Sequence, residues 1–214
     1  MTDELKKKDL SRRTMVKGAA WSVPVLATAV AVPAVSASVN NSSLSWTSSI
    51  TGLLTLTLLD GGGTLSAQAL TTTPTEFTLT NGTGPIDETA TVTIAVGRPS
   101  GLNIPVGQAR GFGVASYDGV DSTPAERTAS YQSAPIVGQF GFPATTFTRA
   151  NVPVNVASNG SLAVPVVFGL AGVSTGVAIS ALASFPVTVT LAFSSGPTLS
   201  AGSSISVPVG AGLL

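Results

Sequence analysis

The sequence predicts an all-β protein: an antiparallel β-sandwich, immunoglobulin-like or jelly-roll-like, that follows a cleavable N-terminal signal segment. Apolar residues alternate with Thr or Ser in short runs over most of the chain, which is the period of half-buried strands. Turns rich in Gly or Asn-Gly separate these runs, as in sheets of antiparallel strands. A basic start followed by a mild apolar run predicts the signal segment.

Residues 1–37 have the features of an export segment. The basic groups that precede the apolar run 18–32 are Lys6, Lys7, Lys8, Arg12, Arg13 and Lys17. Positive charge stays on the cytoplasmic side of a bilayer and therefore orients the run. The run is shorter than the ~20 residues of a spanning helix, and Pro24 interrupts it. Val35 and Ala37 occupy the positions that a signal peptidase reads, so we expect cleavage between Ala37 and Ser38.

The leader contains the segment Ser11-Arg12-Arg13-Thr14-Met15-Val16-Lys17. It resembles the twin-arginine (Tat) signal motif S-R-R-x-F-L-K, with Met15 at the usual Phe and Val16 at the usual Leu. The phrase KGAAWSVPV further resembles leaders of secreted proteins from high-GC Gram-positive bacteria. The resemblance is confined to residues 1–37 and implies the Tat translocase and a signal peptidase as partners during export. A cytoplasmic amphipathic N-terminus or an uncleaved anchor is the alternative.

Residues 38–214 are expected to form one β-sandwich domain. A chain of this length buries roughly 70% of the surface that it exposes when unfolded. No linker of Pro, Gly or charge separates two halves cleanly. Two immunoglobulin-like modules divided near residue 124 are the alternative.

Charge excludes one class of partner. After Ala37 the chain has four arginines against seven acids, a net charge of −3, and no lysine. A nucleic-acid partner requires a basic patch, so nucleic acid is excluded. We expect no permanent membrane span. Cysteine is absent, which suits a domain that folds in the reducing cytoplasm before Tat transport.

Each strand is predicted from a run in which apolar and polar residues alternate, and several of these runs are followed by turn residues. Predicted strands cover 54–58, 77–80, 89–96, 152–156, 162–168, 185–193 and 205–209. Threonine takes the solvent face because its branched Cβ suits a pleated surface. Turn residues follow several of these strands, at 60–63, at Asn81-Gly82 and at 158–161. The turn at 158–161 predicts the clearest hairpin of the chain, between 152–156 and 162–168.

Missing residue types restrict the chemistry. No His, Cys or Lys follows Ala37. Ser–His and Cys–His nucleophile systems, zinc and haem sites, phosphate-binding P-loops and pyridoxal Schiff bases all lack an essential residue. We therefore expect no cofactor, no catalytic residue and a protein that is not an enzyme.

The segment 110–149 differs from its flanks, because it holds both tyrosines after residue 37 and three of the four arginines. Tyr and Arg anchor binding hot spots, which makes Arg110, Tyr117, Arg127 and Tyr131 the candidate binding residues. The structural alternative is a long irregular crossover whose aromatic side chains plug the end of the sandwich.

Three acids in this segment, Asp118, Asp121 and Glu126, are candidate oxygen ligands for Ca²⁺. Their spacing matches no established calcium loop, so a solvated turn is the better interpretation and no metal site is predicted.

These observations predict a secreted protein, extracellular or associated with the cell wall, with an adhesive, binding or structural role. Its candidate ligands are a cell-wall polymer, a carbohydrate or a protein. One alternative is a polysaccharide hydrolase with two carboxyl groups about 5.5 Å or 6.5–9.5 Å apart. The other is an envelope component that assembles through exposed strand edges.

Overall fold

The computed structural model describes residues 39, 41–66, 70–100, 106–175 and 183–207. The chain divides into two compact units, Met1–Ala34 and Val35–Leu214, and every described residue lies in the second. The predicted export and cleavage residues (Ser11, Arg12, Arg13, Lys17, Val35, Ala37 and Ser38) lie outside the described residues, so the division at residues 37 and 38 stays a prediction. Among the described residues, no helix is long and apolar enough to cross a membrane.

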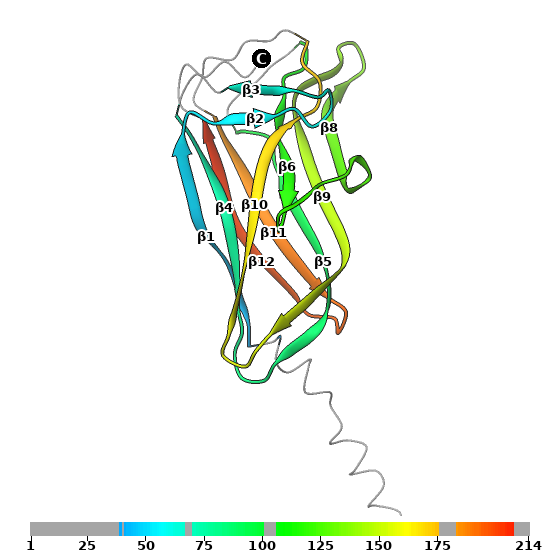
Figure 1. Ribbon diagram of the computed structural model, residues 1–214. Helices are drawn as coiled ribbons and strands as arrows, with labels where there is room; N and C mark the ends of the chain where they lie inside the picture. The colour runs from blue at the N-terminus through cyan, green and yellow to red at the C-terminus, as the bar shows by residue number, and fades with distance from the viewer. Residues whose placement is uncertain (1–38, 40, 67–69, 101–105, 176–182, 208–214) are drawn as a thin grey trace, which may run out of the picture. The chain divides into compact units, whose positions relative to one another are not determined.

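The second unit is built from antiparallel strands, which confirms the predicted all-β, sandwich-like fold (Figure 1). Its strands are β1 (Ser43–Gly52), β2 (Thr55–Thr57), β3 (Thr64–Ser66), β4 (Thr71–Thr80), β5 (Ile86–Val96), β6 (Gly111–Tyr117), β7 (Val120–Asp121), β8 (Arg127–Ala134), β9 (Gly138–Val156), β10 (Ser161–Ala171), β11 (Ala183–Phe193) and β12 (Thr198–Val207). A single 3-10 turn, η1 (Pro124–Glu126), precedes β8.

One large sheet contains most of these strands. Its order is β7-β6-β10-β4-β12-β11-β5-β9-β8, β1 pairs with β4, and β2 and β3 form a separate small sheet. The large sheet curls so that one of its faces encloses the core (Figure 1). Strands from both sides of residue 124 alternate in this sheet, since β4 pairs with β10, and β5 pairs with β9 and β11.

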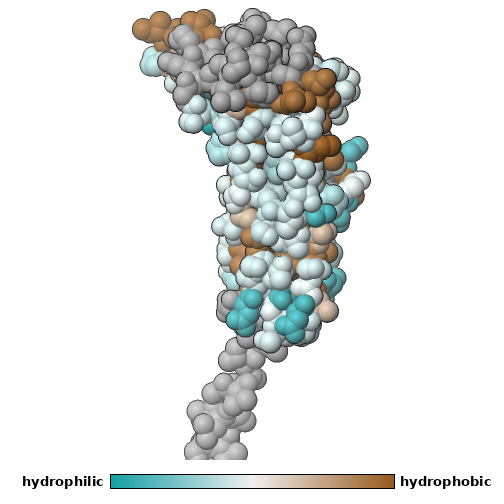
Figure 2. Space-filling model, turned by 90° about the vertical axis from the view of Figure 1, so that its left-hand side faces the viewer, coloured by the Kyte–Doolittle hydropathy of each residue, from teal (hydrophilic) through white to brown (hydrophobic). Residues whose placement is uncertain are grey.

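The alternation seen in the sequence sorts the side chains between core and solvent. In β11 every second residue from Ala183 to Phe193 is buried. Each Val, Leu or Phe that is fully buried stabilises the fold by about 1.5–3 kcal/mol. The outer face carries hydroxyls instead, and those of Thr47 and Thr78, on β1 and β4, hydrogen-bond at 2.8 Å. Serine and threonine give the face shown in Figure 2 its pale, near-neutral surface.

The predicted hairpin between 152–156 and 162–168 is wrong. The turn is present, with Asn159 at a φ of 55° and Gly160 N donating to Ala157 O. The strands that it joins do not pair with each other, however, because β9 pairs with β5 and β8 whereas β10 pairs with β4 and β6. The connection is therefore an arch that crosses from one side of the curled sheet to the other.

Asn81 holds this arch in place. Its side chain is buried, and its Nδ2 donates to Gly84 O at 2.7 Å and to Ala157 O at 3.0 Å. The backbone adds two bonds between the same loops, from Asn81 N to Gly160 O and from Asn159 N to Gly82 O. The arch therefore depends on the β4–β5 loop, far away in sequence, and not on a hairpin ladder of its own.

Candidate functional site

A hollow of about 270 Å³ lies inside the curled sheet, near the β9–β10 arch. It is lined by Phe77, Leu79, Tyr117, Asp118, Val152, Pro153, Val154, Asn155, Leu162, Val164 and Leu191. Most of this lining is aliphatic or aromatic. Ligand sites in proteins are concave and mainly apolar with a few polar groups, and this volume is close to the lower end of their usual ~300–1,000 Å³.

The mouth of the hollow is a seam between two strands that do not pair. Beyond Phe147, β9 continues to Val156 with β5 on one side only. Before Val166, β10 pairs with β4 but not with β6. Both strands thus have a free edge at the level of the hollow, and Pro153, which has no N–H to leave unpaired, lies on one of them.

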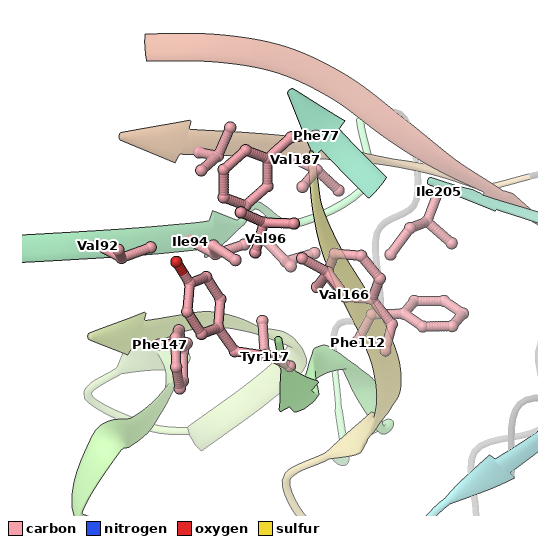
Figure 3. Close-up of a cluster of buried hydrophobic side chains, with 14 of the residues drawn as sticks. Phe77, Val92, Ile94, Val96, Phe112, Tyr117, Phe147, Val166, Val187 and Ile205 are labelled. Atoms are coloured by element: carbon pink, nitrogen blue, oxygen red, sulfur yellow. The ribbon is translucent and has the colours of Figure 1, made fainter. Parts of the chain in front are cut away.

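Tyr117 is the buried polar residue of the lining, whereas Asp118 and Asn155 are exposed. Tyr117 is the last residue of β6, just before a turn in which Asp118 and Gly119 have positive φ. The side chain is only 4% exposed, and its ring stacks on that of Phe147. Figure 3 shows the Tyr117 hydroxyl pointing across the core toward Val92 and Ile94 on β5. The structure gives this hydroxyl no hydrogen bond to a described residue, and its oxygen is not among the fully buried polar atoms that lack a partner, so it keeps some contact with solvent.

The surroundings of Tyr117 keep its hydroxyl protonated. Burial, assisted by the charge of Asp118 and opposed by that of Arg149, raises the pKa of Tyr117 to about 12. The Arg149 guanidinium lies 5.5 Å from the centre of the Tyr117 ring and is ion-paired with Glu126 at 2.6 Å. At neutral pH the hollow therefore contains a neutral phenol that can donate a hydrogen bond.

The four predicted binding residues do not form an exposed cluster. Tyr117 is buried in the core, so it cannot anchor a partner on the surface. Arg127 supports a loop: its Nη1 donates to Ser122 O at 2.6 Å, its Nη2 donates to Leu59 O at 3.1 Å, and its buried Nε has no partner.

Arg110 and Tyr131 come together, but around the backbone at the end of β10. Arg110 Nη1 donates to Gly172 O at 2.6 Å. The Tyr131 hydroxyl donates to Val173 O at 2.6 Å and accepts from Val173 N at 2.8 Å. Asp60 completes this arrangement, because its Oδ2 accepts from Gly172 N at 2.5 Å. Segment 110–149 consists mainly of regular strands, so the alternative of a long irregular crossover is wrong.

The acids are used for structure as well. Within the described residues no three Asp or Glu side chains gather as metal ligands, so Asp118, Asp121 and Glu126 do not form the candidate Ca²⁺ site. Glu126 instead caps η1 through Thr123 and pairs with Arg149.

The carboxylates also do not converge in the cavities. The hollow contains Asp118, a cavity of about 30 Å³ contains Asp60, one of about 130 Å³ contains none, and one of about 240 Å³ beside Arg127 contains Asp121. A pair of carboxyl groups facing one cleft, which a glycoside hydrolase requires, is therefore not found in these four cavities.

Sequence reasoning missed the residues that define the hollow. Val152, Val154, Leu162 and Val164 read as ordinary inward positions of two strands. Their special position results from the arch. The turn at 158–161 is where it was expected, but the two strands that it joins do not pair with each other. Tyr117 was predicted as a binding residue from its type, but its position in the lining of a hollow was not predicted.

Comparison with known proteins gives little. No protein family matches the chain, and no curated protein matches it. The chain is similar to a solved structure described as "AvmM Catalyzes Macrocyclization in Alchivemycin A Biosynthesis", with 13% identity over 79% of this chain and 90% of that chain and a TM-score of 0.36.

This finding corrects one prediction. The similar structure is described as that of a catalyst. The expectation that the chain is not an enzyme does not follow from the missing residue types and is withdrawn. The absence of His, Cys and Lys removes particular mechanisms, whereas carboxylates, tyrosine and backbone N–H groups remain available. A TM-score of 0.36 assigns no reaction, substrate or catalytic residue to this chain.

Proposed function

We propose that the protein is exported by the twin-arginine route and, outside the cell, binds a small apolar molecule in the hollow between β9 and β10. The twin-arginine segment of the leader and the absence of cysteine support the export. The apolar hollow with a mouth between two unpaired strands supports the binding, and it is the observation on which the proposal depends.

The character of the lining favours an apolar ligand over a sugar or a protein. Protein interiors are normally close-packed, so an internal apolar space leaves its walls without contacts that a ligand would supply. The many hydroxyls of a carbohydrate would need polar partners, and the hollow offers mainly Val and Leu side chains. The Tyr and Arg residues that would anchor a macromolecule on the surface are bonded within the fold.

Export is tested by changing Arg12 and Arg13 to Lys together, with Lys6→Arg and Lys7→Arg as the control that also keeps the charge. The double Arg→Lys variant should stay in the cell, while the control should reach the culture medium. The intact mass of the secreted wild-type protein should be that of a chain that begins at Ser38. A wild-type chain that stays uncleaved in the cytosol would contradict the export proposal.

Binding is tested on the purified full chain with benzene as a probe, by following the methyl NMR signals of Val154, Val164 and Leu191. These signals should shift in a saturable way. Leu162→Phe, which fills the mouth, should abolish the shifts, whereas Leu199→Phe, at another partly buried leucine outside the lining, should not. Unchanged methyl signals in the wild-type chain would contradict the binding proposal.

A further inference from the structure

We infer that the ligand of the hollow is an uncharged molecule with an aliphatic body and a carbonyl oxygen, of the ketone or ester class, which accepts a hydrogen bond from the Tyr117 hydroxyl. This inference rests on the proposed binding function and adds the chemical class of the ligand. Three observations carry it: the state of the hydroxyl, the absence of a cation from the lining, and the size of the hollow.

The hydroxyl of Tyr117 is a donor that a ligand can use. The side chain is 4% exposed, lines the hollow, and has no hydrogen bond to a described residue. Its oxygen keeps some contact with solvent, since it is not among the fully buried polar atoms that lack a partner. A ligand that supplies an acceptor therefore gains a hydrogen bond that a purely space-filling ligand does not. In the proposed complex the carbonyl lies at Tyr117 and the aliphatic body lies along Val154 and Val164, which also line the hollow.

A carbonyl satisfies this donor better than an alcohol does. Two hydroxyls that face each other have two hydrogens, and one hydrogen bond between them uses only one. The second hydrogen would then lie against Val and Leu side chains without an acceptor. A ketone or ester oxygen accepts from Tyr117 and brings no donor of its own, so nothing polar is left unpaired.

The charges around the hollow exclude an ionised head group. The lining contains no Arg or Lys, and its one charged residue is the acid Asp118. Arg149, the nearest cation to the Tyr117 ring that the structure shows, is already paired with Glu126. A carboxylate ligand would thus be desolvated without a counter-ion and repelled by Asp118. An amine could approach Asp118, which is exposed, but it would leave the Tyr117 hydroxyl without an acceptor.

The volume limits the length of the molecule. At about 30 Å³ for a group the size of a water molecule, a hollow of 270 Å³ holds on the order of nine such groups. A chain of about eight carbons with one carbonyl fits this space.

The experiment compares 2-octanone with 2-methyl-1-octene, in which a CH₂ group replaces the carbonyl oxygen, on the full-length wild-type chain, Tyr117→Phe and Tyr131→Phe. The affinity for each probe is measured by NMR titration. Tyr117→Phe should weaken 2-octanone binding by about three- to tenfold, the effect of one neutral hydrogen bond, and should not weaken binding of the alkene. Tyr131→Phe removes a hydroxyl outside the hollow and should change neither affinity.

The outcomes separate the two proposals. If 2-octanone and the alkene bind the wild-type chain but Tyr117→Phe weakens neither, or if octanoate binds more tightly than 2-octanone, the assignment of the ligand class is overturned and the binding function stands. If neither probe nor benzene binds the wild-type chain, the binding function itself fails.

Discussion

The rings of Tyr117 and Phe147 stack with their centroids 5.7 Å apart and their planes 28° from parallel, and this contact joins the end of β6 to the middle of β9. Arg149, two residues further along β9, places its guanidinium 5.5 Å from the first ring and 5.3 Å from the second. Its ion pair with Glu126 ties the same wall to η1. Tyr117, which lines the hollow, is thus held in place by the Phe147 ring and by the Arg149–Glu126 pair.

The Glu126–Arg149 pair predicts a loss of stability in acid. The hydrogen bond from Arg149 lowers the pKa of Glu126 from 4.5 to about 2. A carboxylate with a lowered pKa stabilises the folded state fully above its unfolded pKa and loses that contribution as the pH falls. We expect the wild-type chain to lose about 1 kcal/mol, the upper range for a partly exposed pair, between pH 4.5 and about 2.

Urea unfolding of the wild-type chain and of Glu126→Gln across this pH range measures the effect. The difference between them should be full at pH 6 and should shrink toward pH 2. A difference that does not change with pH would show that the ion pair does not contribute.

Tyr117→Phe is predicted to leave the ligand-free protein as stable as the wild type or up to about 1 kcal/mol more stable. The substitution removes a hydroxyl that has no hydrogen bond to a described residue and keeps the stacked ring. Tyr131→Phe is the matched control. Its hydroxyl bonds to both backbone groups of Val173, so its removal should cost about 1–2 kcal/mol. Thermal and urea unfolding check both, and a Tyr117→Phe protein less stable than Tyr131→Phe would contradict the account.

Asn81→Ala is predicted to destabilise the fold by about 2 kcal/mol, because the buried Asn81 side chain donates part-buried hydrogen bonds to the carbonyls of Gly84 and Ala157. Asn155→Ala provides the comparison, since Asn155 is exposed on β9 and should change the free energy of unfolding by no more than about 0.5 kcal/mol. Equal effects of the two substitutions would mean that Asn81 does not hold the arch.

Gly172→Ala should cost about 3 kcal/mol. The residue has a φ of +83°, and a Cβ at this position would collide with the Tyr131 hydroxyl and with Pro143. Gly62→Ala separates the backbone strain from the collision. Gly62 has a φ of +69°, but nothing lies within 4 Å of an added Cβ there. Gly62→Ala should lower the free energy of unfolding by only about 1 kcal/mol, which is the cost of the left-handed backbone conformation for a residue with a Cβ. Calorimetry of both variants measures the difference in lost stability. Similar losses for Gly172→Ala and Gly62→Ala would show that the collision with Tyr131 and Pro143 does not contribute.

The fold class could be predicted from the sequence because alternation between core and solvent is a local property. In β5, Val92, Ile94 and Val96 are buried at every second position, as the pattern indicates. The same pattern gives no information on which strands pair. Turn residues at 158–161 suit a hairpin and an arch equally, and the pairing of β9 with β5 and of β10 with β4 is decided by contacts far apart in sequence.

The hollow could not be predicted for the same reason. Tyr117 stood out by residue type, but its burial follows from the stacking on Phe147 and from the turn at Asp118, neither of which composition reveals. The inward valines of β9 and β10 line the hollow because the arch keeps these strands apart.

The central claim, that a small apolar molecule occupies the hollow, is tested most directly by intermolecular NOEs between 2-octanone and the methyl groups of the full-length chain. The account predicts NOEs to Val154, Val164 and Leu191, which line the hollow. NOEs only to side chains such as Ile136, which is 98% exposed in the β8–β9 turn, would place the molecule on the surface and contradict the claim.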